Sequence, residues 1–243
     1  MKTIGIVCEG PRDYDMISSV ILQIVGQEVA FRLLQPDSEL GAELGAGWKG
    51  VLHWCETYSA DLLSSLLRDV RPTIDLLIVQ IDADVARREK EVYCYRVDLG
   101  CKDARQQPLN CSIAKEGACP QQLPPNPLCD GSIQGRVDYL SQLIDSLLKP
   151  GSETVVITVP SDSTDAWILA AYEDEMQNVE SIDSPWDIIS SKKEYHGVRI
   201  PGHSKNKRQY GKLIEKVCQN WSVVTQKCAQ AKLFEELVMK DCV

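Results

Sequence analysis

The chain has 243 residues and a formal net charge of −9. This length is enough to bury a full core as one domain with an insertion, or as one and a half domains. No apolar run approaches the roughly 20 residues that a membrane span needs, and the N-terminus lacks the basic and apolar regions of a signal peptide. We therefore expect a cytoplasmic protein without membrane contact, and the negative charge argues against broad electrostatic capture of nucleic acid.

The first predicted strand covers residues 3–8 and runs directly into Glu9-Gly10-Pro11. A helical pattern follows over residues 13–25, with one apolar stripe formed by Ile17, Val20, Ile21 and Ile24. A strand, an acidic residue, a glycine turn and a helix are the opening of a βαβ unit. This pattern places Glu9 at the carboxyl end of a strand, where ligands bind in open α/β sheets.

A Gly-rich turn at residues 45–50 precedes one amphipathic helix, predicted over residues 52–67. The glycines lack the spacing of a phosphate-binding loop and are not followed by Gly-Lys-Ser/Thr, so the sequence does not support ATP binding. We assign this segment to the scaffold.

The second predicted strand begins at Leu76 and is followed by Asp82-Ala83-Asp84. Because alternate side chains of a strand point to the same side, we expect Asp82 and Asp84 to project together where the strand ends. Two carboxylates held together repel each other unless a proton or a hard cation neutralises them. The pattern therefore predicts a Mg²⁺ or Mn²⁺ site.

Residues 91–131 are an irregular insertion rich in proline and cysteine, with Cys94, Cys101, Cys111, Cys119 and Cys129. Structural Zn²⁺ would suit a small insertion without its own core, although no Cys-x-x-Cys pair occurs. Disulfides would suit an exported protein, and unlinked thiols in a reducing compartment are the simplest interpretation. The insertion is a candidate specificity loop, partner-binding surface or lid.

A third strand, predicted over residues 154–159, follows a helix that covers residues 139–148 and stops at Pro150-Gly151. The strand ends before Asp162, and Asp165 opens the next helix. Parallel topology would bring these acids to the same sheet edge as Glu9, Asp82 and Asp84. Each acid alone also has an ordinary structural interpretation, because Asp is a common turn residue and helix N-cap.

A basic stretch in a segment with Gly and Pro contains Lys192, Lys193, Arg199, His203, Lys205, Lys207, Arg208 and Lys212. Lys205 and Lys207 are the leading candidates for phosphate contact, because they precede a predicted helix over residues 210–220. A solvated surface loop is the alternative, and His196 and His203 are secondary candidates. This helix and a last one, predicted over residues 222–240, would cover one face of the sheet or form a homodimer contact.

These motifs resemble the TOPRIM fold, on the strand ending in Glu9-Gly10, the strand ending in Asp82-Ala83-Asp84, and Asp165 before Ala166-Trp167-Ile168-Leu169-Ala170. The closest likeness is to TOPRIM-like proteins related to the OLD-family nucleases, including small stand-alone members associated with anti-phage defence. The likeness covers most of the chain except the insertion.

The resemblance implies an α/β fold with a Rossmann-like, mostly parallel sheet flanked by helices. It implies a single domain over residues 1–243, with a C-terminal helical part from about residue 205 to residue 243. In that family the glutamate and the Asp-x-Asp pair bind divalent metal for phosphodiester chemistry. Those roles would fall here on Glu9, Asp82 and Asp84, and Asp165 would match a further family acid.

On this resemblance we expect a Mg²⁺- or Mn²⁺-dependent phosphodiesterase, a nuclease that acts on DNA or RNA in anti-phage defence. Glu9, Asp82 and Asp84 would hold one or two ions, Asp165 would ligate a second ion or act as a base, and Lys205 or Lys207 would neutralise developing charge. The alternatives are a non-catalytic or partner-activated subunit, for example of a complex with an ATPase, and a hydrolase of small phosphoesters.

Overall fold

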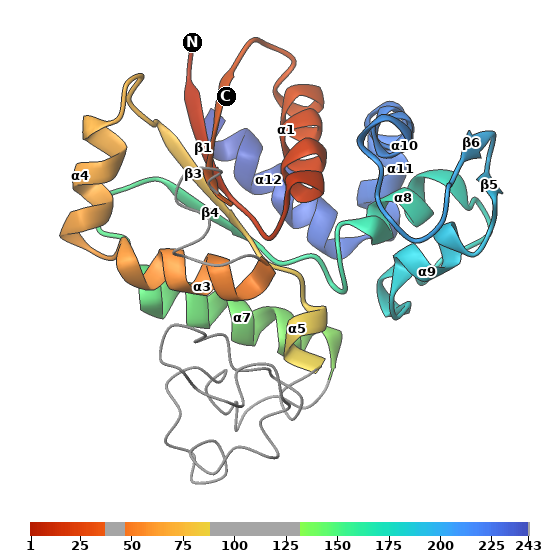
Figure 1. The fold of residues 1–243 in the computed structure, drawn as a ribbon. Coiled ribbons are helices and arrows are strands. Elements are labelled where there is room, and N and C mark those ends of the chain that lie inside the picture. Colours follow the sequence, from red (N-terminus) through yellow and green to blue (C-terminus); the bar gives the residue numbers. More distant parts are fainter. Residues whose placement is uncertain (37–46, 88–131, 243) are drawn as a thin grey trace, which may run out of the picture.

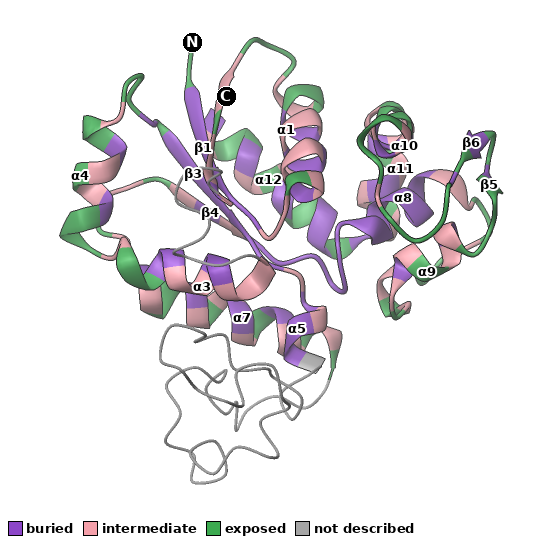
Figure 2. Ribbon diagram, in the orientation of Figure 1, coloured by how far each residue is buried: buried purple, intermediate pink, exposed green. Residues whose placement is uncertain are grey.

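Parallel strands form the centre of the protein in the computed structural model, which describes residues 1–36, 47–87 and 132–242 (Figure 1). The sheet has the order β2-β1-β3-β4, with β1 at Thr3–Val7, β2 at Ala30–Gln35, β3 at Leu76–Gln80 and β4 at Val155–Thr158. Every neighbouring pair in it is parallel. The central strands β1 and β3 are buried along their whole length (Figure 2).

Helices cover both faces of the sheet. Helices α1 (Pro11–Val25) and α12 (Ala229–Cys242) lie on one face, and α3 (Gly47–Thr57) and α7 (Ile133–Leu148) lie on the other, with α4 (Asp61–Asp69) beyond α3 (Figure 1). Alternate strand residues supply the two cores: Ile4, Ile6 and Ile78 pack on the α1 side, and Val7, Leu77 and Val79 pack on the α3 side. The fold is therefore α/β and Rossmann-like, as the sequence predicted.

A group of shorter elements packs beside α1. It comprises α8 (Asp165–Tyr172), η2 (Val179–Ser181), α9 (Pro185–Ser190), the strands β5 (Glu194–Tyr195) and β6 (Val198–Arg199), α10 (Lys207–Gln219) and α11 (Trp221–Lys227). Helix α8 is almost entirely buried in this group (Figure 2). The Trp167 ring packs against the rings of Trp221 and Phe234, at centroid distances of 5.4 and 5.9 Å. This packing fixes the start of α8 against the rest of the molecule.

The strand order creates a topological switch point between β1 and β3. From β1 the chain passes through α1 to β2 on one side, and from β3 it continues to β4 on the other side. The connections diverge from the carboxyl ends of these two adjacent strands, and in open α/β sheets ligands bind in the crevice at this position. The residues that follow β1 and β3 are therefore the first place to look for a site.

The predicted strands over residues 3–8, 76–81 and 154–159 are confirmed as β1, β3 and β4. Strand β2 was not predicted, and it is a half-exposed edge strand interrupted by Arg32. The predicted helix over residues 52–67 is wrong, because the chain leaves helical geometry at Ala60 (φ 50°) and forms α3 and α4. The last predicted helix is likewise divided, at Cys228, into α11 and α12.

None of the helices within residues 1–36, 47–87 and 132–242 combines the length and apolarity needed to cross a membrane. The insertion at residues 91–131, and with it the choice between structural Zn²⁺, disulfides and unlinked thiols, lies outside the described residues. The cysteines that are described (Cys8, Cys55, Cys218, Cys228 and Cys242) are free thiols.

Candidate functional site

Glu9 and Asp82 meet at the switch point. Glu9 lies two residues after the end of β1, and Asp82 lies two residues after the end of the adjacent β3. The Glu9 Oε1 atom accepts a hydrogen bond from the backbone N–H of Asp82 at 2.7 Å. The predicted convergence of these two strand-end acids is therefore present in the structure.

Gln80, the last residue of β3, forms hydrogen bonds with both Glu9 and Asp82. Its Oε1 atom accepts a hydrogen bond from the Glu9 N–H at 3.3 Å, and its Nε2 group donates to Asp82 Oδ1 at 2.7 Å. The side chain is fully buried and so holds both acids in a fixed geometry. The sequence analysis missed Gln80, although a polar residue inside an otherwise apolar strand is a recognisable signal.

Asp84 is close enough to Glu9 and Asp82 for its charge to act on both. The predicted reason for this proximity is wrong, because β3 ends at Gln80 and strand alternation does not extend to Asp82 or Asp84. Asp84 is instead the first residue of the short helix α5 (Asp84–Arg87), and its N–H donates to the Asp162 carbonyl at 3.1 Å. A turn anchored on the β4 end therefore positions this acid.

Burial and the neighbouring negative charges make the carboxyl groups of Glu9 and Asp82 costly to ionise. Burial raises the pKa of Glu9 to about 8, against the hydrogen bond from Asp82, and the charges of Asp13 and Asp84 add to the rise. Burial also raises the pKa of Asp82 well above its usual value, and the charges of Glu9, Asp13 and Asp84 contribute. Both side chains are half-buried, so each still meets solvent. A bound cation would relieve this repulsion.

Asp165 lies in a second group of polar side chains, at the start of α8. Its Oδ2 atom forms an ion pair with Lys205 Nζ at 2.6 Å, and its Oδ1 atom accepts a hydrogen bond from the Tyr210 hydroxyl at 2.8 Å. The Ser163 hydroxyl also donates to Oδ2, at 3.4 Å. The Asp165 side chain is only 2 % exposed. Both of its oxygen atoms are therefore engaged by groups of the chain itself.

Asp13, in the first turn of α1, belongs to this second group and was not predicted from the sequence. Its Oδ1 atom accepts a hydrogen bond from the Thr164 hydroxyl at 2.8 Å, and the residue is 8 % exposed. Burial raises the pKa of Asp13, while Lys205 and Thr164 oppose that rise. The available signal was its position four residues after Glu9, in the first turn of the helix that follows β1.

Lys205 connects the two groups. Burial acts to lower its pKa, but the carboxylates of Asp165, Asp13 and Asp82 outweigh burial and raise the pKa above the ordinary value. The ammonium also lies 5.6 Å from the ring centre of Trp186 and 5.7 Å from that of Tyr210. Such rings attract cations, so Lys205 is held by both carboxylates and aromatic faces.

Other predicted side chains lie outside this cluster. Lys207 is exposed at the start of α10 and lines an open hollow with Asp15, Arg208 and Lys212. Asp162 lies beside the cluster: its carboxylate accepts a hydrogen bond from the Ser184 N–H, and its backbone carbonyl accepts one from the Asp84 N–H, each at 3.1 Å.

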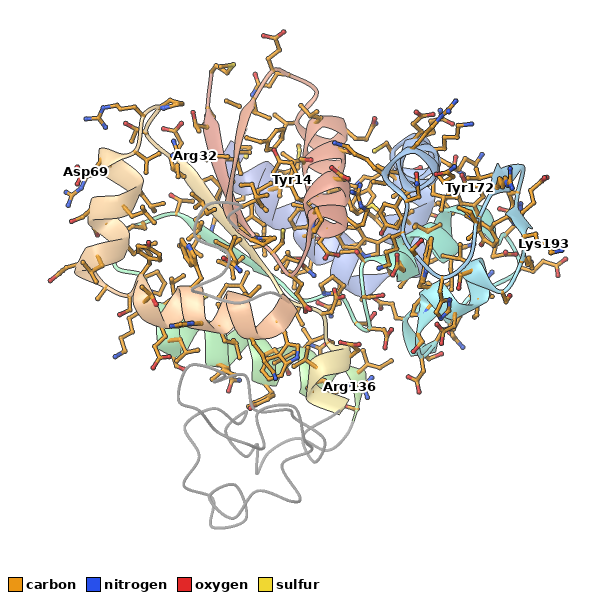
Figure 3. The ribbon with its side chains drawn as sticks, in the orientation of Figure 1. Tyr14, Arg32, Asp69, Arg136, Tyr172 and Lys193 are labelled. Carbon is orange, nitrogen blue, oxygen red and sulfur yellow. The ribbon has the colours of Figure 1, made fainter. Side chains whose placement is uncertain are left out.

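The remaining basic candidates lie at the surface of the α9–β6 region. His203 pairs with Asp187 and His196 pairs with Glu173, each at 3.2 Å. Lys193 lies at the outer edge of the molecule beside β5 (Figure 3). These two histidines thus pair with acids at the surface, whereas Lys205 pairs with the buried Asp165, and the structure separates Lys205 from them.

The donor chemistry of the strand-end acids suits a hard cation, because carboxylate oxygens are the ligands that Mg²⁺ and Mn²⁺ prefer. In the part of the chain that the structure describes, however, no three His, Cys, Asp or Glu side chains are already arranged to hold an ion. Glu9, Asp82 and Asp84 thus fit a metal by ligand type and by mutual repulsion. Small side-chain movements would be needed to complete the coordination.

Comparisons with protein-family models, curated proteins and solved structures gave no match for this chain. Function must therefore be inferred from the geometry of the site.

Proposed function

We propose that this chain is a TOPRIM-like, metal-dependent phosphodiesterase that cleaves DNA or RNA, with a role in anti-phage defence as the setting that the resemblance suggests. One observation carries the proposal: the acids that follow β1 and β3, Glu9 and Asp82, are joined at the switch point of a parallel sheet. This is the position at which open α/β folds bind ligands. The raised pKa values of both acids supply the physical reason for a cation there.

Glu9, Asp82 and Asp84 are the residues that would hold Mg²⁺ or Mn²⁺. When bound, such an ion lowers the pKa of a water molecule and stabilises charge on phosphate oxygens. Gln80 accepts a hydrogen bond from the Glu9 backbone and donates to the Asp82 carboxylate, and so holds the two residues next to each other. The ammonium of Lys205 lies at the border of the cluster, where it would stabilise negative charge on a phosphate.

The basic side chains that follow Lys205 support a phosphate-containing polymer as substrate. Lys207, Arg208 and Lys212 lie on the first turns of α10 and line one hollow of the surface, together with the acids Asp15 and Glu215. The net charge of −9 means that any polymer contact must be local, along this helix, and sensitive to salt.

A partner-activated or non-catalytic binding subunit is the second candidate. It is favoured by the absence, in residues 1–36, 47–87 and 132–242, of three side chains already placed to hold a metal ion. In this case a partner protein, for example an ATPase, would complete the site or use it as a docking surface. A hydrolase of small phosphoesters is a further outcome of the same experiment, and the acidic net charge would suit it.

The experiment that tests the proposal is cleavage of plasmid DNA, single-stranded DNA, RNA and a chromogenic phosphodiester, with Mg²⁺ or Mn²⁺. The test variant is Asp82→Asn, which removes one charge at nearly constant shape. Asp69→Asn is the matched control, because Asp69 is exposed on α4, far from the switch point (Figure 3).

Cleavage by the wild type and Asp69→Asn, but not by Asp82→Asn, would support the nuclease and identify its substrate. Cleavage of the chromogenic ester alone would indicate a small-phosphoester hydrolase. A folded wild type that cleaves nothing would contradict catalysis by the isolated chain and favour the partner-activated subunit.

A further inference from the structure

We propose that Lys205 is a built-in cation that occupies the Asp13–Asp165 half of the acidic cluster, so that the site takes one divalent ion rather than two. The inference rests on the proposed function and specifies its metal stoichiometry. The single ion would lie with Glu9, Asp82 and Asp84, and Asp165 would anchor Lys205 instead of binding metal.

The hydrogen bonding of Asp165 supports this division. Tyr210 donates to one carboxylate oxygen at 2.8 Å, and Lys205 contacts the other at 2.6 Å. Tyr210 is itself fully buried, and Asp165 is 2 % exposed, so neither group has ready access to a hydrated ion. A metal at Asp165 would have to displace the ammonium and break a charge-assisted contact.

Asp13 belongs with Asp165, because its carboxylate is also engaged by groups of the chain. Its Oδ1 atom already accepts the Thr164 hydroxyl, and Thr164 directly precedes Asp165 in the chain. Lys205 acts electrostatically on both Asp13 and Asp165. One ammonium thus serves two buried carboxylates that come from different elements, α1 and α8.

Lys205 is fixed in this place by its surroundings. The side chain is 29 % exposed, and the rings of Trp186 and Tyr210, which pack against each other, both lie within 6 Å of the ammonium, as cation–π contacts require. A dication placed beside Asp165 would lie next to this ammonium and be repelled by it. Glu9 and Asp82 are partly buried, and their carboxylates accept hydrogen bonds from the Asp82 N–H and the Gln80 amide, which carry no charge, so this is the half that a dication would occupy.

The test is a count of bound Mn²⁺ ions per chain, measured by electron paramagnetic resonance of free Mn²⁺ during titration of the chelator-treated full chain. The wild type should bind one ion, and Asp82→Asn should lose it. Lys205→Met keeps the length of the side chain without the charge and should bind two ions. The double variant Lys205→Met/Asp165→Asn should return to one ion, because it also removes the vacated ligand.

Two controls accompany these variants. Lys205→Arg keeps the positive charge and should bind one ion. Lys207→Met removes a positive charge two residues away, on an exposed side chain, and should also bind one ion. If Lys205→Met unfolds without metal, thermal melting over a Mn²⁺ series gives the same information: its midpoint should depend more steeply on Mn²⁺ than that of the double variant.

Two ions bound by the wild type, with Asp82→Asn losing at least one, would leave the metal site in place and overturn the role of Lys205. One ion bound by both the wild type and Lys205→Met would also overturn it. No ion bound by either protein would overturn the metal site itself and the proposed function with it.

Discussion

Two pairs of carboxylates lie at the same edge of the sheet, and the chain treats them differently. Asp13 and Asp165 are buried beside the ammonium of Lys205, and hydroxyl groups of Thr164 and Tyr210 donate to them. Glu9 and Asp82 are partly buried, and their carboxylates accept hydrogen bonds from neutral amide groups. Lys205 compensates mainly the first pair and acts less strongly on Asp82, so the second pair is left largely to protons or ions from solvent.

The Asp13–Asp165 pair therefore serves the stability of the fold, and the Glu9–Asp82 pair is the candidate for function. A buried carboxylate that has its own cation contributes to a fixed structure, and removing either partner is costly. A carboxyl group with a raised pKa is costly to ionise in the folded state, and such groups are concentrated at functional sites.

The largest effect is expected from removal of the compensated acid. Asp165→Ala leaves the Lys205 ammonium without its ion-pair partner and the buried Tyr210 hydroxyl without its acceptor. We expect a loss of about 3 kcal/mol in the free energy of unfolding, measured by urea denaturation. Asp187→Ala, which removes an exposed acid paired with His203, is the control and should cost about 0.5 kcal/mol or less. Similar losses in both variants would contradict the compensation of Asp165 by Lys205.

The second effect concerns pH. Burial raises the pKa of Glu9 to about 8 from an ordinary value of 4.5, so the folded protein binds more protons than the unfolded chain between these pH values. The contribution of Glu9 to the free energy of unfolding of the metal-free protein should therefore be greatest below pH 4.5. It should fall as the pH rises towards 8. The slope contributed by one such group is at most about 1.4 kcal/mol per pH unit.

Glu9→Gln should flatten this profile, and saturating Mg²⁺ should do the same to the wild type by favouring the ionised carboxylate. Thermal melting at several pH values, with Asp69→Asn as the control, measures both. A profile that Glu9→Gln leaves unchanged would show that Glu9 ionises normally in the folded protein.

The part of this site that the sequence predicts is the part carried by strand ends. Apolar runs that stop just before acids locate Glu9 and Asp82, the start of the helix after the third strand locates Asp165, and parallel topology brings the strands to one edge. The strand order itself was not predictable, because β2 is an edge strand with a half-exposed, irregular pattern.

The contacts within the site could not be read from the sequence, because they join elements that are distant along the chain. Asp13 meets Thr164, Asp165 meets Tyr210, and these pairs are 151 and 45 residues apart. Lys205 and Lys207 looked equivalent in sequence, since both precede or begin the same helix. Only the packing of α8, α9 and α10 shows that one of them enters the cluster.

The third effect tests the hydroxyl that supports Asp165. Tyr210→Phe keeps the buried ring and removes the donor to Asp165 Oδ1. We expect a loss of about 2 kcal/mol in the free energy of unfolding, because hydrogen bonds to charged groups contribute more than neutral ones. Tyr195→Phe is the matched control: its hydroxyl donates to Glu173, whose side chain is 26 % exposed, so its loss should be smaller. Equal losses would mean that burial of Asp165 does not strengthen its hydrogen bond.

The smallest effect on stability is expected at Lys207, which is the exposed counterpart of Lys205. Lys207 is exposed on α10, two residues after Lys205, so its ammonium is solvated in the folded and unfolded states alike. Lys207→Met should change the free energy of unfolding by no more than about 0.5 kcal/mol, as surface substitutions usually do. Binding of a labelled single-stranded oligonucleotide should nevertheless weaken and become less dependent on salt, because one fewer phosphate contact releases fewer counterions. A clear loss of stability with unchanged oligonucleotide binding would place Lys207, rather than Lys205, among the residues that hold the acidic cluster together.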